Sequence, residues 1–347
     1  MTDAALAGAD LGFLAVDRYV AGLVGARALQ SAFELRLIDH LAEGGNGSEA
    51  ALLRALKVDA QGLRLLLGLL EAAGVTERRR GATALTEGFT EALRYRDLLQ
   101  AKLDFAGVLL DDFADGFTRL LRDPERFTGE ARLYQLFDYQ RALQPGHENW
   151  QRTRGWMRLT TALTRYEARA ALSLCDLSGR RRLLDVGGNS GEFALQACRR
   201  HPQLSATVVD LPVVCEVGLE NVLPHREATR IAFLPRDMRR DPLPGGHDVV
   251  AFKSMLHDWP EAEALAFLEK AVAAVEPGGT VLVFERGPLQ PRQLPPFSQL
   301  PVLLFFRSYR PASVYLRHLE ALGMADVRCQ DITLDTPFHL VSARRPG

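Results

Sequence analysis

Features that mark several classes of protein are scarce in this sequence. Its 347 residues carry a formal net charge of −1, whereas nucleic-acid-binding proteins normally show a basic footprint. The four cysteines are scattered without metal-type spacing, so we expect a reduced cytoplasmic protein whose cysteines pack in its core and hold no metal. The acidic N-terminus does not look like a signal peptide.

Long hydrophobic runs are also missing. The longest charge-free apolar stretch, residues 293–306, contains several prolines and is too short to span a bilayer, so no membrane association is expected. We interpret this stretch as a buried loop or the wall of a pocket.

The first half of the sequence has a helical pattern. Apolar residues recur at three- and four-residue spacing over 11–41, and two short helices are predicted over 52–56 and 63–73. A small hairpin with a charged turn at 78–80 follows them. This order is typical of a winged helix, a fold that often binds DNA. The second short helix argues against that role, because it is rich in leucine and Arg64 is its only basic residue, whereas base edges are read by polar side chains.

The remaining elements follow from a change of period along the chain. Helices are predicted over 93–121, 134–143 and 150–174, with a turn at 123–127. Short apolar runs then alternate with helical segments, which predicts a parallel, doubly wound sheet. The predicted strands are 183–186, 206–209, 231–234, 248–252 and 281–284. Two last strands, 327–331 and 338–343, are joined by a link too short for a crossover, so they should pair antiparallel.

A glycine-rich turn follows the first predicted strand, in Leu183-Leu184-Asp185-Val186-Gly187-Gly188-Asn189-Ser190-Gly191-Glu192. Glycine lets a ligand approach the backbone, and the helix that follows begins with unpaired N–H groups. A dinucleotide and S-adenosylmethionine compete as ligands. The dinucleotide fingerprint requires glycine where this chain has Asn189 and Glu192. S-adenosylmethionine has no phosphate and is cationic, so the acids Asp185 and Glu192 favour it.

Polar side chains also stand at the ends of the other predicted strands. Asp210 follows the glycine turn by about 20 residues, where an acid usually binds ribose hydroxyls. Asp237, His257 and Glu285 lie at or just after the ends of the third, fourth and fifth strands. Ligands of doubly wound sheets bind at this edge, so these residues define a candidate site.

Several motifs together strongly resemble the S-adenosylmethionine-dependent O-methyltransferases of the caffeate and hydroxyindole type. The motifs are Leu183 to Gly191, Val209-Asp210-Leu211-Pro212, Arg236-Asp237-Met238, His257-Asp258-Trp259 and Pro277-Gly278-Gly279. The resemblance covers nearly the whole chain, and bacterial members act on aromatic secondary metabolites. It implies an α/β fold with a Rossmann-like methyltransferase domain over 106–347, including linking helices. It also implies an all-helical, winged-helix domain over 1–105 that makes a homodimer.

The resemblance implies a role for each candidate site residue. Eight residues match positions at the cofactor S-adenosylmethionine: Asp185, Gly187, Gly188, Asp210, Leu211, Asp237, Met238 and Lys253. His257 matches the catalytic base, and Glu285 matches one of two acids that flank it. Met157 matches a methionine that packs on an aromatic substrate. Trp156, Asp258 and Tyr309 are further candidates on the substrate side, although Asp258 could instead cap the following helix.

One position departs from the family pattern. The second flanking acid should fall near Tyr309, and no carboxylate is there. Either the methyl acceptor is more acidic than a simple phenol or the chemistry has drifted. Arg307 and Arg310, beside the proline-rich stretch, could bind a carboxylate on the substrate or could simply be solvated.

The sequence therefore predicts a homodimeric O-methyltransferase that acts on a small aromatic or enolic hydroxyl, without a nucleic-acid or membrane partner. Two alternatives stay open. The same fold and cofactor could serve C- or N-methylation or a non-methylating reaction, and the chain could be a winged-helix regulator that senses a ligand through its sheet domain.

Overall fold

The computed structural model describes residues 22–132, 134, 139–288 and 309–347. The proline-rich stretch 293–306 and Arg307 lie outside these residues. The chain divides into two compact units, Met1–Phe117 and Thr118–Gly347. Helix α6 (Arg96–Arg122) is continuous across this division and also contains the domain boundary predicted after residue 105.

The first unit consists of short helices and one hairpin. Its elements are α1 (Gly22–Glu34), α2 (Leu37–Ala42), α3 (Glu49–Leu56), α4 (Ala60–Ala72), β1 (Thr76–Arg79), β2 (Ala82–Leu85), α5 (Glu87–Ala92) and a 3-10 turn (Leu93–Tyr95). The predicted hairpin is confirmed, with Thr76 paired to Leu85. The continuous helix predicted over 11–41 is wrong for its described part, because Arg36 adopts a left-handed φ of 61° that ends α1 before α2 begins.

Leucines of α4 face two ways in this unit. Leu63 and Leu70 are fully buried with Leu37, Ile38 and other apolar residues of the unit. Leu65, on the same helix, is 66% exposed. The helix thus fills the core of its own unit with one side and leaves apolar surface on the other.

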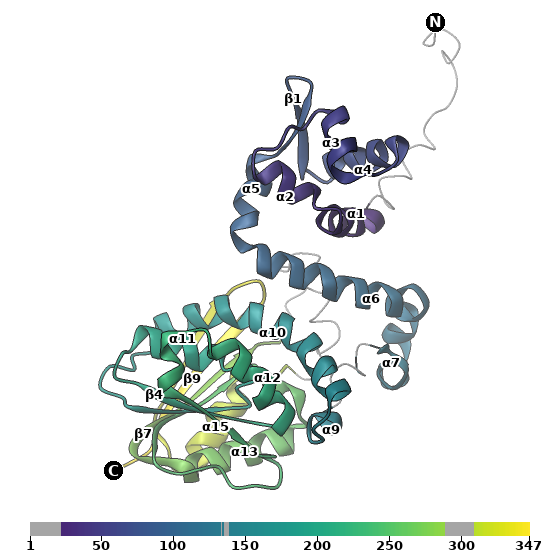
Figure 1. Ribbon diagram of the computed structural model, residues 1–347. Coiled ribbons are helices and arrows are strands. Elements are labelled where there is room, and N and C mark those ends of the chain that lie inside the picture. Colours follow the sequence, from purple (N-terminus) through teal and green to yellow (C-terminus); the bar gives the residue numbers. More distant parts are fainter. Residues whose placement is uncertain (1–21, 133, 135–138, 289–308) are drawn as a thin grey trace, which may run out of the picture. The chain divides into compact units, whose positions relative to one another are not determined.

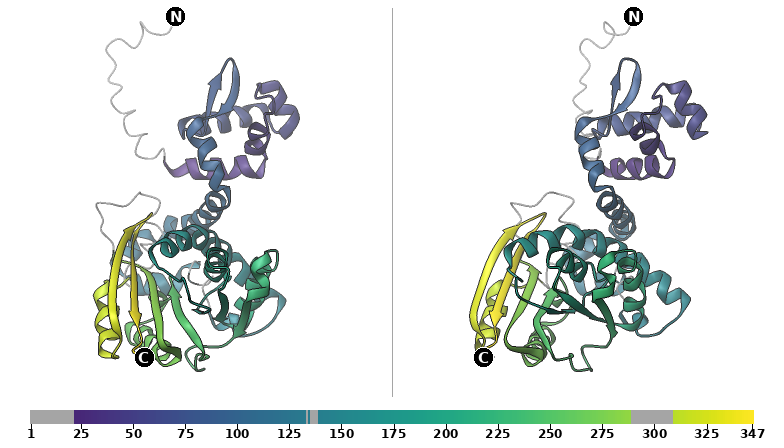
Figure 2. Two further views of the ribbon diagram at one scale, coloured as in Figure 1. Left: turned by 90° about the vertical axis from the view of Figure 1, so that its left-hand side faces the viewer. Right: turned by 60° about the vertical axis from the view of Figure 1, so that its left-hand side comes forward.

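The second unit is built on a seven-stranded sheet in the order β5-β4-β3-β6-β7-β9-β8. The strands are β3 (Arg182–Val186), β4 (Ser205–Asp210), β5 (Ile231–Pro235), β6 (His247–Lys253), β7 (Val275–Arg286), β8 (Ala325–Thr333) and β9 (Pro337–Arg344). The first five are parallel, and β9 pairs antiparallel with β8, as predicted; β9 also pairs antiparallel with β7. The hairpin β8–β9 forms one edge of the sheet (Figure 2).

Helices cover both faces of this sheet (Figure 1). Helices α10 (His147–Leu174) and α11 (Glu192–Arg200) pack on one face in a core with Leu183 and Phe284. Helices α13 (Glu261–Ala274) and α15 (Ala312–Ala321) pack on the other in a core with Val250 and Val283. Further helical elements are α7 (Pro124–Glu130), α9 (Tyr139–Ala142), α12 (Pro212–Val222) and the 3-10 turns Arg226–Arg230 and Leu256–Asp258. Among the described residues, no helix is long and apolar enough to cross a membrane.

The turn predicted at 123–127 is in fact the start of a helix. Pro124 occupies the first position of α7, and the side chain of Asp123 accepts a hydrogen bond from the backbone N–H of Arg126. Proline is tolerated at this position because its missing N–H would have no partner in the helix. The Asp-Pro pair therefore begins a helix here.

Candidate active site

The site lies where the strand order reverses. From β3 the chain moves to β4 and β5 on one side and then returns to β6 on the other side of β3. Ligands of doubly wound sheets bind beyond the carboxyl ends of the strands at such a point. Gly187 follows β3 there with a φ of 63°, and a Cβ on it would lie 2.6 Å from Cγ of Met255, which follows β6. The turn is therefore close to the neighbouring chain segment and requires glycine.

Asp185 lies beneath this turn. Its side chain is fully buried, and neither carboxylate oxygen accepts a hydrogen bond of normal geometry from the described residues. Burial raises the pKa of Asp185 to about 7, although the backbone N–H of Ala194 acts to lower it. A Cβ on Gly188 would lie 2.7 Å from this carboxylate, so the backbone of the glycine turn passes directly over it. An unpaired buried carboxylate of this kind fits a cationic ligand.

Glu192, the other acid of the turn, has a different environment. It is buried, accepts hydrogen bonds from Gln196 and Asn221, and lies 3.6 Å from Nε of Arg165 on α10. Its charge is therefore compensated within the protein. Of the two acids predicted to attract a cationic ligand, only Asp185 therefore has a charge that the described part of the protein does not compensate.

Asp210 is held in one orientation at the end of β4. Its Oδ2 accepts from the backbone N–H of Asn189 at 2.8 Å, and its Oδ1 accepts from the backbone N–H of Leu211 at 2.7 Å. Burial raises the pKa of Asp210 to about 6. Each carboxylate oxygen can accept a second hydrogen bond, so the geometry leaves capacity for two adjacent hydroxyl groups. Leu211 packs beside it in an apolar cluster that includes Met157 and Val213.

Asp237 and Met238 follow β5, and both have partners within the protein. Asp237 forms a bidentate pair with Arg239, with both N–O distances at 2.9 Å, and the guanidinium holds the pKa of Asp237 below its usual range. Arg239 also lies over the ring of Trp259. Met238 is buried in the core, and its carbonyl accepts a hydrogen bond from Lys270.

Lys253, at the end of β6, is bound to helix α10. Its amine donates to the carboxylate of Glu167 and, at 2.9 Å, to the hydroxyl of Thr164. Glu167 also pairs with Arg286, whose Nη2 lies 2.5 Å away. This buried group of two cations and one shared carboxylate joins α10 to the ends of β6 and β7. The hydrogen bonds of the Lys253 amine in the described residues are both to side chains of α10.

His257 and Glu285 form the central pair of the site. Nδ1 of His257 lies 2.6 Å from Oε2 of Glu285, and the other carboxylate oxygen accepts from the backbone N–H groups of Met255 and Leu256, both at 2.7 Å. An ionised carboxylate only accepts hydrogen bonds, so Nδ1 carries the proton and Nε2 of the neutral ring is an acceptor. Burial alone would lower the pKa of His257, but Glu285 and Asp258 raise it above its ordinary value. Glu285 is fully buried, and its pKa is lowered by His257 and these N–H groups despite burial.

Asp258 lies on the other side of the imidazole. Its Oδ1 is 3.5 Å from Nε2 of His257, and its Oδ2 accepts a 2.7 Å hydrogen bond from the hydroxyl of Tyr139 on α9. The alternative that Asp258 caps the following helix is excluded, because the residue at the N-cap of α13 is Pro260. Tyr309 packs its ring edge against His257, with ring centroids 5.1 Å apart, and brings no charge.

Aromatic side chains continue outward from this pair. Tyr139 stacks on Trp259 with centroids 5.7 Å apart and meets Trp156 edge to face at 6.3 Å. Met157 is buried in the adjoining cluster. The structure thus brings Trp156 and Met157 to the same side of the site as Asp258.

Arg310 does not have the role considered for it from the sequence. It is buried and donates to the carbonyls of Leu256, at 3.0 Å, and Trp259, on either side of His257 and Asp258. It also lies 3.7 Å from a carboxylate oxygen of Glu261. Arg310 is therefore neither solvated nor open to a substrate carboxylate; it holds the segment that carries the histidine.

The contacts of two residues of the site, Tyr139 and Arg310, do not follow from the sequence. Tyr139 lies in a helix of four residues, and its hydrogen-bond partner Asp258 is 119 positions away in the sequence. For Arg310 the sequence suggested either a contact with a substrate carboxylate or a solvated charge. No local pattern connects either residue with the histidine segment.

Comparison with known proteins gives consistent results. Residues 134–295 match the family model of the O-methyltransferase domain. The chain is 31% identical over 274 residues to 3-hydroxy-5-methyl-1-naphthoate 3-O-methyltransferase of Streptomyces sahachiroi, covering 76% of this chain and 74% of that protein. It is 31% identical over 267 residues to demethylspheroidene O-methyltransferase of Cereibacter sphaeroides, covering 77% and 68%. The crystal structure of the S-adenosylmethionine-dependent methyltransferase SibL in its apo form superimposes with a TM-score of 0.64 at 25% identity, covering 96% of this chain and 99% of that one.

Proposed function

Because the chain belongs to the S-adenosylmethionine-dependent O-methyltransferases, we propose that it methylates a hydroxyl group of a small aromatic or enolic metabolite with His257 as general base. The observation that carries the assignment of the base is the 2.6 Å contact between Nδ1 of His257 and Glu285. This contact places the ring proton on Nδ1 and leaves Nε2 able to accept a proton.

The residues around the glycine turn fit the cofactor. S-adenosylmethionine, when bound, supplies a methyl carbon activated by a sulfonium. Asp185 would compensate positive charge, since its buried carboxylate accepts no hydrogen bond of normal geometry from the described residues. Asp210 would accept hydrogen bonds from the ribose, and Gly187 and Gly188 would allow the backbone to approach. Leu211, Asp237, Met238 and Lys253 remain proposals by resemblance, and Asp237 would have to exchange or share its contact with Arg239.

The protein's main chemical task is to remove the proton from the acceptor. A phenol has a pKa of about 10 and a free histidine has one of about 6.5. Complete proton transfer from the phenol to the histidine would therefore cost about 5 kcal/mol. Glu285 and Asp258 narrow this gap because they raise the pKa of His257. Proton removal can accompany methyl transfer, so full deprotonation beforehand is not required. Glu285 fixes the ring tautomer and stabilises the imidazolium as it forms.

Asp258 supplies the second carboxylate in this proposal. The position near Tyr309 holds no acid, but Oδ1 of Asp258 lies 3.5 Å from Nε2 of His257. Because this oxygen is on the same side as the proton-accepting nitrogen, it can stabilise the imidazolium and accept a hydrogen bond from a second polar group on the substrate. The chain would thus replace the missing acid with one held by Tyr139.

The acceptor is proposed to be aromatic. The relatives reported above are named for methylation of a naphthoate and of demethylspheroidene. In this chain Tyr139, Trp156 and Trp259 form a contiguous aromatic group next to Asp258. Flat apolar ligands gain favourable contact area from such rings.

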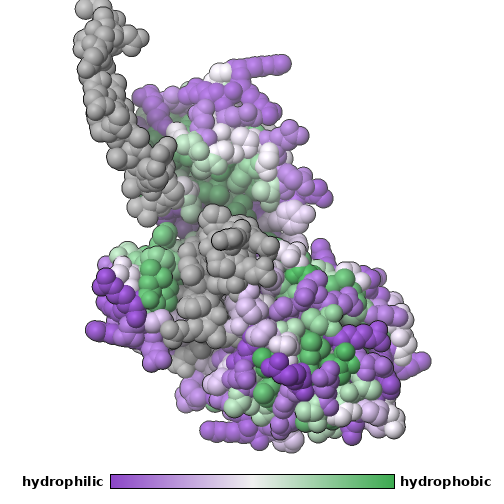
Figure 3. All heavy atoms as spheres, turned by 180° about the vertical axis from the view of Figure 1, so that it is seen from behind, coloured by the Kyte–Doolittle hydropathy of each residue, from purple (hydrophilic) through white to green (hydrophobic). Residues whose placement is uncertain are grey.

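The first unit is proposed to be a winged-helix dimerisation domain. Its helices are followed by a hairpin, and several apolar residues of this unit have large exposed fractions, including Leu65 and Val24. Figure 3 shows apolar surface on this unit below its hydrophilic tip. Contiguous apolar area on a surface is often the site where a partner binds. Light scattering should give a dimer, and Leu65→Asp should weaken it, whereas Arg64→Asp on the same helix should have a smaller effect.

Binding and turnover test the proposal separately. S-adenosylhomocysteine should raise the melting temperature of the protein and NAD should not; the reverse result would contradict the cofactor assignment. Transfer of a labelled methyl group should then be screened over phenolic and enolic acceptors, with amine analogues of the same ring systems beside them. Transfer to amines alone would favour the N-methylation alternative and remove the proposed acceptor class.

A further inference from the structure

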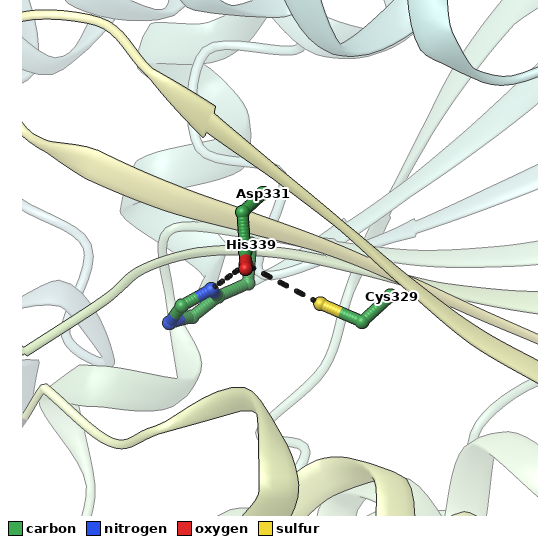
Figure 4. Close-up of side chains that lie close together, drawn as sticks. All are labelled: Cys329, Asp331 and His339. Atoms are coloured by element: carbon green, nitrogen blue, oxygen red, sulfur yellow. Dashed lines mark hydrogen bonds and ion pairs between the residues drawn. The ribbon is translucent and has the colours of Figure 1, made fainter.

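The β8–β9 hairpin carries three side chains with metal-binding atoms. Cys329 and Asp331 lie on β8, and His339 lies on β9 (Figure 4). Asp331 is paired directly with His339 in the antiparallel ladder, and Cys329 is two positions before Asp331, so all three side chains share one face of the sheet. One ligand atom from each residue lies within 4.8 Å of the other two.

Hydrogen bonds already orient these side chains toward one point. Oδ1 of Asp331 lies 2.5 Å from Nδ1 of His339 and accepts from the thiol of Cys329 at 3.5 Å. Figure 4 shows this oxygen between the imidazole and the sulfur. Cys329 and His339 are partly buried, whereas the Asp331 side chain is 77% exposed. The cluster therefore has a protein wall on one side and access from solvent on the other.

We propose that Cys329, Asp331 and His339 form a binding site for a divalent transition-metal ion of the zinc type, with solvent as the fourth ligand. A thiolate, an imidazole and a carboxylate are the three ligand types that zinc accepts, at about 2.3 Å for sulfur and about 2.0–2.2 Å for nitrogen and oxygen. Neighbouring ligand atoms around such an ion are roughly 3.5 Å apart. Small side-chain rotations on a paired hairpin are enough to reach that spacing.

Charge and ligand softness favour this class of ion. Thiolate and carboxylate together neutralise a divalent cation, and sulfur is a poor ligand for magnesium or calcium. Without a metal, the Cys329 thiol donates its proton in the hydrogen bond to Asp331. Binding would release that proton to solvent and replace the contact between His339 and Asp331 with two bonds to the ion.

The spacing of cysteines along the sequence gave no indication of this site. Only one ligand is a cysteine, and the histidine comes from the next strand, eight positions after the aspartate. The site lies on the hairpin at the edge of the sheet, and none of its three ligands is among the residues proposed for methyl transfer, although His339 is paired with Glu285 in the neighbouring strand. A bound ion would cross-link β8 to β9. Strand β9 in turn pairs with β7, the strand that carries Glu285.

Cobalt(II) gives the most direct test, because it reports sulfur ligation by its absorption. Untagged, chelator-treated protein should bind one Co²⁺ per chain with a thiolate-to-metal band in the near ultraviolet, and Zn²⁺ should displace it. Cys329→Ser should abolish that band, and Asp331→Asn and His339→Gln should weaken affinity at least tenfold. Cys175→Ser, which alters the other partly buried cysteine, should leave the band unchanged.

Stability gives a second, independent readout. Zn²⁺ should raise the melting temperature of the parent protein and should not raise that of His339→Gln, while S-adenosylhomocysteine still stabilises both if the proposed cofactor site is correct. The absence of a sulfur band in the parent protein, or the same band in Cys329→Ser, would overturn the metal site. Neither result bears on the proposed methyl transfer.

Discussion

The hydroxyl of Tyr139 donates a 2.7 Å hydrogen bond to Oδ2 of Asp258. The other oxygen of Asp258 lies 3.5 Å from Nε2 of His257, the nitrogen that faces away from Glu285. Tyr139 is also stacked on Trp259, so its ring has little freedom to turn. A residue of the linking helices thereby orients a carboxylate beside the proposed base, and Tyr139 is a positioning residue in this scheme.

Tyr139→Phe should lower kcat/KM about tenfold, because it keeps the stacked ring and removes only the hydrogen bond that orients Asp258. Steady-state kinetics across pH should also show a change in the acid limb, since Asp258 contributes to the raised pKa of His257. Tyr166→Phe, which removes the hydroxyl of a tyrosine on α10 whose ring is covered by Arg169, serves as the control. Equal kinetics for the two variants would show that the hydrogen bond does not matter for catalysis.

His257→Gln should reduce kcat by about 10²-fold or more, because glutamine cannot take up the acceptor proton. Stabilisation by S-adenosylhomocysteine should persist, since His257 is not among the proposed cofactor contacts. His225→Gln, at a site distant in sequence from the histidine segment, should have parental activity. A parental rate for His257→Gln near neutral pH would exclude His257 as the base.

The pH dependence follows from the direction of the His257 shift. Its pKa is raised above 6.5 and the neutral ring is the active form in the proposed mechanism, so activity should rise as the pH increases through that raised value and be lost below it. Glu285→Gln removes the charge that raises the pKa of His257 most, so the acid limb of the pH–activity profile should move to lower pH. Its amide group would also favour the wrong ring tautomer, and kcat should fall as well. An acid limb that stays in place would assign it to another group.

Glu167→Gln should destabilise the second unit by about 3–5 kcal/mol, because Lys253 and Arg286 would stay buried without their shared counter-charge. Urea denaturation followed by circular dichroism measures this change. Glu216→Gln, an exposed acid on α12, should change stability by less than about 0.5 kcal/mol. A similar small change for Glu167→Gln would show that the buried ion group contributes little to stability.

Gly187→Ala should abolish stabilisation by S-adenosylhomocysteine. The new methyl group would lie 2.6 Å from Cγ of Met255 and would meet a φ of 63°, so the turn has to shift. Gly179→Ala provides the matched control, since its φ is 80° and no atom lies within 4 Å of the new Cβ. Both variants bear the cost of a positive φ, and only Gly187→Ala should lose cofactor binding.

Much of the sheet and of the strand ends could be predicted because both follow local rules. The alternation of strands and helices fixes parallel order, and parallel strands bring Asp185, Asp210 and Glu285 to one edge. His257 was found for the same reason, since it follows β6 by only a few residues. The position of each of these residues depends on the strand that it ends or follows. It depends little on how a helix is rotated about its own axis.

The partners of these residues could not be predicted in the same way. Glu192 pairs with Arg165, and Lys253 with Glu167, because α10 presents those side chains toward the sheet. The rotation of a helix and the register of a hairpin determine such contacts, and neither is written in a short window of sequence. The cluster of Cys329, Asp331 and His339 was missed for this reason.

The segment that carries His257 is anchored on both of its sides. Glu285 accepts from the N–H groups of Met255 and Leu256, and Arg310 donates to the carbonyls of Leu256 and Trp259. These anchors are buried groups that bind backbone atoms, so they place no demand on the identity of the side chains that meet the acceptor. Substitutions among those side chains can therefore accumulate while the proposed base keeps its position. This makes the scaffold well suited to acquiring new methyl acceptors by mutation.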